Sequence, residues 1–224
     1  LEACIQGGNW LVAQNTTTYN LSFYVGNSGV AYTLVQLYRI TGDKAYHEKA
    51  IDIVKVSVQN STPYGHITNT DLLLGHAGSL LGLAHLHSNI KEDWLLEQIN
   101  IYINFLIHYA KFGQKGISWD GNSFDHVRNL CGFSHGVSGI GWVFLELAYY
   151  FQNEALTIIA DQAFQYENLY LDKEHLNWFD FRSSAGKELY DKAVDTMELM
   201  ELKDAKNKSD YRSGKVEDLL APKH

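Results

Sequence analysis

Glycines divide much of the chain into units with the same hydrophobic pattern. Three times a Gly-x-x-Gly motif precedes a mostly apolar run of helix length, with the motifs at 26–29, 75–78 and 136–139. The first glycines of successive motifs are 49 and 61 residues apart (75 − 26 and 136 − 75). A pattern that recurs at such intervals is typical of stacked helical pairs.

Each apolar run is followed, after a short turn, by a more polar segment of helix length, at 43–58, 91–110 and 153–170. The runs after the glycines are apolar nearly all round, which predicts inner helices. In the segment 43–58, Ile51, Val54 and Val58 form one face, as in an amphipathic outer helix. Inner helices ringed by outer helices predict an all-α fold, an α/α toroid. Its three glycine-containing loops are then expected to face one central cavity.

A fourth unit is predicted to be incomplete. The segment 186–200 reads like the first outer helix, but no Gly-x-x-Gly and no apolar run precede it, and only three residues separate Arg182 from Gly186. The chain's own repeat therefore predicts a missing inner helix between Arg182 and Gly186. We expect one toroid domain over 1–203 and a polar C-terminal tail over 204–224.

The composition and charge of the chain indicate which classes of binding partner are disfavoured. The 224 residues carry a formal net charge of −8, which argues against nucleic acid or an anionic membrane as the main partner. The apolar runs are too short to span a bilayer. Cys4 and Cys131 are the only cysteines, so a disulfide framework is not expected and a reducing, cytoplasmic location is favoured.

Two stretches carry a specific resemblance. "GFSHGVSGIGWVFLELAYYF" at 132–151, followed by "NWFDFR" at 177–182, resembles the lanthionine synthetase C-like (LanC-like) cyclase family over about residues 15 to 200. The resemblance implies an α/α toroid that acts in lantibiotic biosynthesis. Such enzymes add cysteine thiols of a dehydrated, ribosomally made precursor peptide to dehydroalanine or dehydrobutyrine, forming thioether rings. It also implies a dehydratase domain or partner that prepares this peptide.

The same resemblance assigns roles to individual residues. The histidine of the family's H-G-x-x-G loop matches His135, expected to be the general acid/base. The family's aspartate before the second glycine loop matches Asp71, expected to assist it. The W-x-D-x-R element matches Trp178, Asp180 and Arg182, expected to bind substrate.

The family's zinc ligands have no match. They are two cysteines and a histidine in W-C-x-G and C-H-G loops that follow the W-x-D-x-R element, and no cysteine follows Cys131 here. Zinc is expected from the resemblance, but its ligands are absent from this chain. The W-C-x-G loop would belong to the missing helix of the fourth unit.

Each candidate residue also has a plain structural interpretation. His135 fits a core histidine, although its glycine-rich loop at a helix N-terminus favours proton transfer. Asp71 fits a helix N-cap. Asp180 and Arg182 fit a structural ion pair beneath Trp178, which we favour over direct chemistry.

Cysteine and histidine elsewhere give weaker signals. Cys131 fits a thiolate nucleophile or a metal ligand, but a free cysteine is more often simply buried. His76 lies in the second glycine loop, where it is expected to line the cavity and contact substrate. His76, His85 and His87 lack the spacing of an established zinc site, so no metal ligand is assigned.

Three function classes remain. The favoured one is a LanC-like cyclase domain, impaired in this chain by the absent zinc ligands. The second is a LanC-like module that binds a peptide or protein without catalysis. The third, a toroid enzyme acting on sugars, needs paired carboxylates. Asp120, Asp125 and Asp180 are its candidates, but the glycine loops carry histidine rather than acids.

Overall fold

The computed structural model describes residues 1–15, 20–60, 63, 69–121 and 128–182. The chain forms two compact units, Leu1–Ala110 with Asp120–Asn122, and Lys111–Trp119 with Ser123–His224. The suspected gap between Arg182 and Gly186, the segment 186–200 and the predicted boundary at 203 lie outside the described residues.

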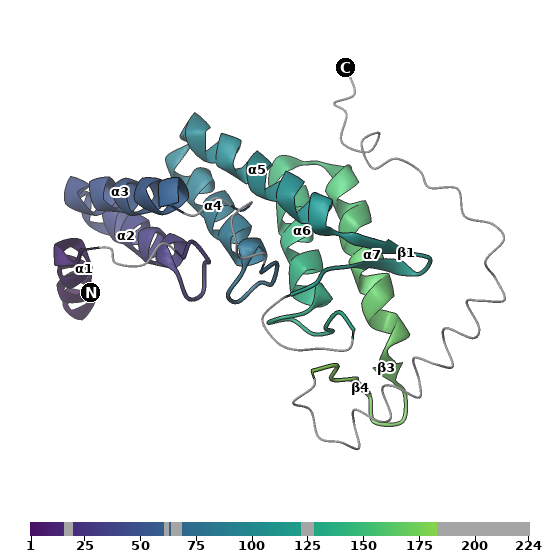
Figure 1. The fold of residues 1–224 in the computed structure, drawn as a ribbon. Coiled ribbons are helices and arrows are strands. Elements are labelled where there is room, and N and C mark those ends of the chain that lie inside the picture. Colours follow the sequence, from purple (N-terminus) through teal and green to yellow (C-terminus); the bar gives the residue numbers. More distant parts are fainter. Residues whose placement is uncertain (16–19, 61–62, 64–68, 122–127, 183–224) are drawn as a thin grey trace. The chain divides into compact units, whose positions relative to one another are not determined.

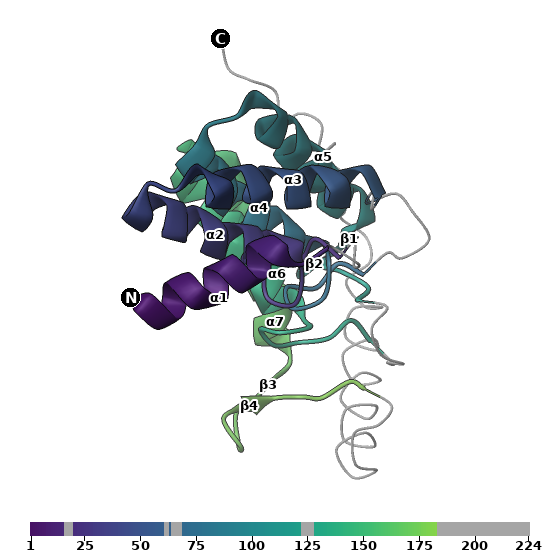
Figure 2. The same cartoon turned by 90° about the vertical axis from the view of Figure 1, so that its left-hand side faces the viewer.

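The first unit consists of five helices within its described residues: α1 (Glu2–Ala13), α2 (Asn27–Thr41), α3 (Lys44–Asn60), α4 (His76–Ile90) and α5 (Asp93–Tyr109). Helix α2 packs on α3 and α4 packs on α5, and α2 also contacts α4 (Figures 1 and 2). These are the predicted pairs of inner and outer helices.

The second unit contains one more helix pair and two short hairpins. Helix α6 (Val137–Phe151) packs along α7 (Glu154–Leu169). One antiparallel hairpin joins β1 (Lys111–Gly113) to β2 (Gly116–Ser118) and contacts α7, and another joins β3 (Leu171–Asp172) to β4 (Asn177–Trp178). The hairpins were not predicted, because strands of two or three residues are too short to show an alternating pattern.

The fold class is confirmed: the described chain is all-α apart from these hairpins, with the inner and outer helices of an α/α toroid. Helix α4 is buried from Ala77 through Ala84, as expected of an inner helix. Helix α2 differs, because Thr33, Arg39 and Ile40 lie on an exposed side. The described residues contain no helix long and apolar enough to cross a membrane.

The outer helix α3 is amphipathic, but its buried stripe is centred slightly off the predicted face. Its core residues are Tyr46, Ala50, Ile53, Val54 and Ser57, while Ile51 and Val58 lie half-buried at the edge. Ser57 is polar, and its buried hydroxyl is hydrogen-bonded. It accepts from the Asn27 side chain at 2.7 Å and donates to a main-chain carbonyl at 2.8 Å.

The three inner helices begin in the same way. Each begins at the second residue of its Gly-x-x-Gly motif, with the first glycine as an extended N-cap that offers no side chain. In each, the first helical N–H returns to the carbonyl seven residues earlier: Asn27 to Asn20 at 2.8 Å, His76 to Asn69 at 2.9 Å and Val137 to Leu130 at 3.0 Å. One main-chain bond therefore closes each loop and satisfies a free helix donor.

Candidate functional site

The third loop, residues 130–136, carries the candidate histidine. It leads from the buried Leu130 to the N-cap Gly136, and it turns at Gly132, whose φ of +101° suits glycine far better than other residues. His135 lies half-buried directly before the N-cap. The imidazole is thus attached to a short loop whose two ends are joined by the Val137–Leu130 hydrogen bond.

A pocket of about 470 Å³ brings this loop together with the W-x-D-x-R element. Residues 130–135 and residues 177–182 line it. Trp178 and Phe133 are 41% and 49% exposed, so both offer aromatic surface to a ligand. His135, Trp178, Asp180 and Arg182, selected from the sequence, therefore share one pocket in the second unit.

Within this pocket Asp180 and Arg182 form the pair that the sequence suggested. The Arg182 Nε donates to both carboxylate oxygens of Asp180, at 2.9 and 3.1 Å, and Nη2 donates to Oδ2. Phe181, which lies between them in the sequence, is buried. The hydrogen bonds from Arg182 lower the pKa of Asp180. The carboxylate is therefore occupied by the guanidinium, which favours a structural role.

We expect Asp180→Asn to lower the free energy of unfolding by about 1 kcal/mol at neutral pH, because the pair is partly exposed. Since the pKa of Asp180 is lowered by folding, its contribution is present above the ordinary carboxyl pKa and is lost as the pH falls through the lowered value. Urea unfolding should show the free energies of unfolding of the wild type and Asp180→Asn converging as the pH falls through the lowered pKa of Asp180. Asp161→Asn, at an exposed position of α7, is the matched control, and a constant difference at all pH values would contradict the pairing.

Asp71 lies in the second loop, in the first unit. It is fully buried, and its Oδ1 accepts from the main-chain N–H groups of Leu74 and Gly75 at 2.7 and 2.9 Å. It thus braces its own loop just before α4, although the N-cap itself is Gly75. His135 belongs to the other unit, so the role of Asp71 as its helper stays a prediction.

His76 begins α4 in the first unit and lies half-buried. Its ring packs edge-to-face on Phe105 at 4.5 Å and on Tyr102 at 5.5 Å between ring centroids. These contacts fit a structural role beside the outer helix α5. Contact with substrate stays a prediction for this residue.

Comparison with protein-family models gives one match, to the lanthionine synthetase C-like protein family, over residues 3–193. The match spans most of the 224-residue chain. The chain belongs to this family. The LanC-like resemblance drawn from the H-G-x-x-G and W-x-D-x-R motifs is therefore confirmed, and both motifs lie in the matched region.

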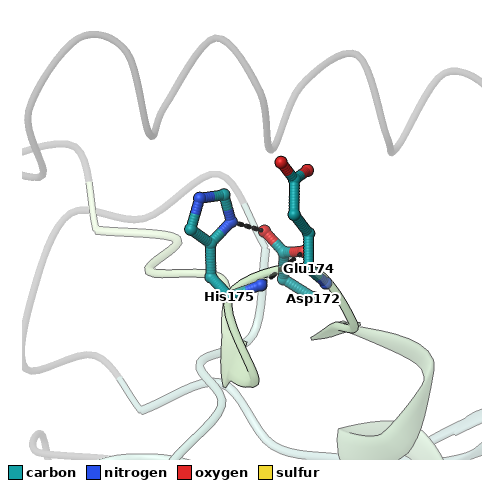
Figure 3. Close-up of side chains that lie close together, drawn as sticks. All are labelled: Asp172, Glu174 and His175. Atoms are coloured by element: carbon teal, nitrogen blue, oxygen red, sulfur yellow. Dashed lines mark hydrogen bonds and ion pairs between the residues drawn. The ribbon is translucent and has the colours of Figure 1, made fainter.

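Zinc is general in LanC-like proteins, but the residues described here do not fit the cysteine and histidine ligands that the resemblance implies. Among them, the one group with metal-ligand spacing is Asp172, Glu174 and His175 on the hairpin between β3 and β4 (Figure 3). Asp172 already accepts from the main-chain N–H groups of Glu174 and His175 and lies 2.8 Å from the His175 ring. These hydrogen bonds are those of a turn and account for the closeness of the three side chains. The cluster contains no cysteine and so supplies no thiolate ligand.

Cys131 lines the pocket but does not fit a thiolate role. Burial is the main cause that raises the pKa of Cys131, and the neighbouring Glu167 carboxylate raises it further. The neutral thiol is therefore favoured, whereas nucleophiles and zinc ligands are thiolates. Cys131 is half-buried and not fully buried, and a neutral thiol accounts best for these surroundings.

Glu167 on α7 is the site residue that the sequence analysis missed. It is only 4% exposed, and its carboxylate accepts from the Gly132 N–H at 2.9 Å. A signal was present: Leu156, Ala160, Ala163 and Glu167 follow one buried stripe of the helix. An ionisable residue in an otherwise apolar stripe indicates a specific partner.

Proposed function

We propose that this chain provides the proton-transfer part of a LanC-like cyclase, which joins a thiol to a dehydroalanine or dehydrobutyrine residue of a precursor peptide. The observation that carries the proposal is the pocket that His135 and the W-x-D-x-R element line together. Family membership supports a peptide as the substrate. The exposed rings of Trp178 and Phe133 would contact that peptide.

The reaction requires that one proton be delivered to Cα of the dehydrated residue. A thiolate sulfur attacks Cβ of the dehydrated residue, the C=C electrons move toward the carbonyl, and an enolate forms. The His135 imidazolium then gives its proton to Cα, and a proton from solvent, to which the ionised thiol lost its own, restores the imidazolium. Histidine suits this step because its ordinary pKa lies near neutrality.

Asp71 is proposed to assist the proton transfer, and His76, Trp178, Asp180 and Arg182 are proposed to hold the peptide. The bidentate Asp180–Arg182 pair would do so indirectly, by fixing the segment that carries Trp178. The zinc ligands that the resemblance implies are absent from this sequence. The chain must therefore receive its thiolate from solution.

The test is a cyclisation assay with a synthetic peptide containing one cysteine and one dehydroalanine. Near pH 7.5 about a tenth of the free thiol is ionised and about a tenth of an ordinary imidazole is protonated, so both the nucleophile and the proton donor are present in buffer with a chelator. Ring closure leaves the mass unchanged, so loss of the alkylatable thiol is measured. We expect a roughly 100-fold acceleration by saturating chain, the range of general acid catalysis. A rate equal to that in buffer would refute the proposal.

The second candidate, a binding module without catalysis, is favoured by one observation: no cysteine follows Cys131 to hold a metal. The same assay separates the two functions. A peptide that binds the chain, measured by calorimetry, but closes its ring no faster than in buffer identifies the binding module. Acceleration that depends on the chain identifies the cyclase domain.

A further inference from the structure

The three glycine loops differ in what holds their turn. In the first two loops an asparagine starts the turn. The Asn20 side chain accepts from the Ser22 N–H at 2.8 Å, and the Asn69 side chain accepts from the Asp71 N–H at 3.1 Å. Such a bond to the N–H two residues onward is the turn that asparagine commonly forms.

In the third loop, the residue at the position of Asn20 and Asn69 has no side chain that can accept this hydrogen bond. Leu130 occupies the position of Asn20 and Asn69, as the shared seven-residue return shows. The leucine side chain has no acceptor atom and is buried. The neighbouring Asn129 donates from its side-chain amide to the Ser118 hydroxyl at 2.8 Å.

Glu167 supplies that acceptor from another element. The Gly132 N–H, which corresponds to those of Ser22 and Asp71, donates to both carboxylate oxygens of Glu167, at 2.9 and 3.2 Å. A bond to a carboxylate is stronger than a bond to the neutral amide it replaces. The third loop is thus fastened to α7, whereas the first two turns are closed by their own side chains.

The same carboxylate holds the far end of the loop. It also accepts from the main-chain N–H and the hydroxyl of Ser138, in the first turn of α6. The N-cap Gly136 has no side chain to satisfy these helix donors, and a negative group is favoured at a helix N-terminus. Glu167 therefore binds residues on both sides of His135.

We infer that Glu167 is a positioning residue, which clamps Gly132 to Ser138 and so fixes the orientation of the His135 ring in the pocket. The catalytic consequence rests on the proposed function, but the clamp itself does not. Burial raises the pKa of Glu167, and the hydrogen bonds from Ser138 and Gly132 offset part of this effect. Burying an ionisable group costs free energy of folding, which a leucine or alanine at position 167 would not.

The experiment is amide hydrogen exchange by NMR on the full chain, comparing Glu167→Gln with the wild type. Glutamine keeps the size but replaces one acceptor oxygen by a donor. We expect the Gly132 and Ser138 amides to exchange at least about tenfold faster, because local opening becomes easier. The carbon-bound ring protons of His135 should shift, while amides in the middle of α6 and α7 keep their protection. Glu154→Gln, an exposed position of the same helix, should change none of these signals.

Two results would overturn the inference. Unchanged exchange at Gly132 and Ser138 would show that the carboxylate does not hold the loop. A uniform loss of protection through α6 and α7 would show that Glu167 supports the helix pair and not the loop in particular. Neither measurement uses a peptide, so a failed cyclisation assay would reject the proposed function and leave the clamp standing.

Discussion

Gly136→Ala is expected to lower the free energy of unfolding by about 3 kcal/mol, near the upper end for overpacking a filled site. A Cβ at this position would overlap the main-chain carbonyl group of Cys131 and lie 2.6 Å from the Leu130 oxygen. That oxygen accepts the hydrogen bond that closes the loop. Because these neighbours are backbone atoms, they cannot move aside as a side chain can, and the loop must open. Urea denaturation followed by circular dichroism measures the change.

Gly7→Ala is the matched control for this prediction. Gly7 lies inside α1, and nothing lies within 4 Å of a Cβ built there. Alanine is the better helix former, so this variant should gain up to about 1 kcal/mol. Equal effects of the two substitutions would show that close approach of the backbone does not explain the glycine at position 136.

His135→Ala is expected to remove most of the acceleration of ring closure, a loss of roughly 100-fold toward the rate in buffer. Without the imidazole, the enolate must take its proton from water, while the peptide still meets the aromatic surface of the pocket. The measurement is the loss of alkylatable thiol, at peptide concentrations below and above saturation. We expect the maximal rate to fall and the peptide affinity to change little.

His175→Ala serves as the control, since it removes an exposed histidine from the hairpin of the same unit. Its rate should equal that of the wild type. If His135→Ala cyclises the peptide as fast as the wild type does, His135 has no role in proton transfer and its ring is only part of the loop structure.

The helix pairs could be predicted because glycine spacing and apolar periodicity are local signals. The helices nevertheless begin inside the Gly-x-x-Gly motifs, at Asn27, His76 and Val137, one residue after the N-cap. The sequence alone places the start later, because the polar first turn carries no apolar pattern. What fixes it is the main-chain return to a residue seven positions earlier, which no side-chain pattern reveals.

The site was predicted where a motif is contiguous and missed where it is not. Asp180 and Arg182 are two residues apart, so their pairing follows from an extended segment. Glu167 meets Gly132 across 35 residues, and such a contact depends on how α7 packs against α6. The meeting of the His135 loop with the W-x-D-x-R segment in one pocket depends likewise on the hairpin between β3 and β4, which was not predicted.

The closure of the loops by main-chain atoms has a consequence for how such a protein acquires chemistry. Directly before the N-cap glycine stand Val25, Leu74 and His135 in the three loops, and the first two are 48% and 40% exposed. The bond that shapes each loop involves none of these side chains. The residue at this position can therefore differ between the repeats, and one repeat can carry a reactive ring while the other two keep inert side chains and the same closing main-chain bond.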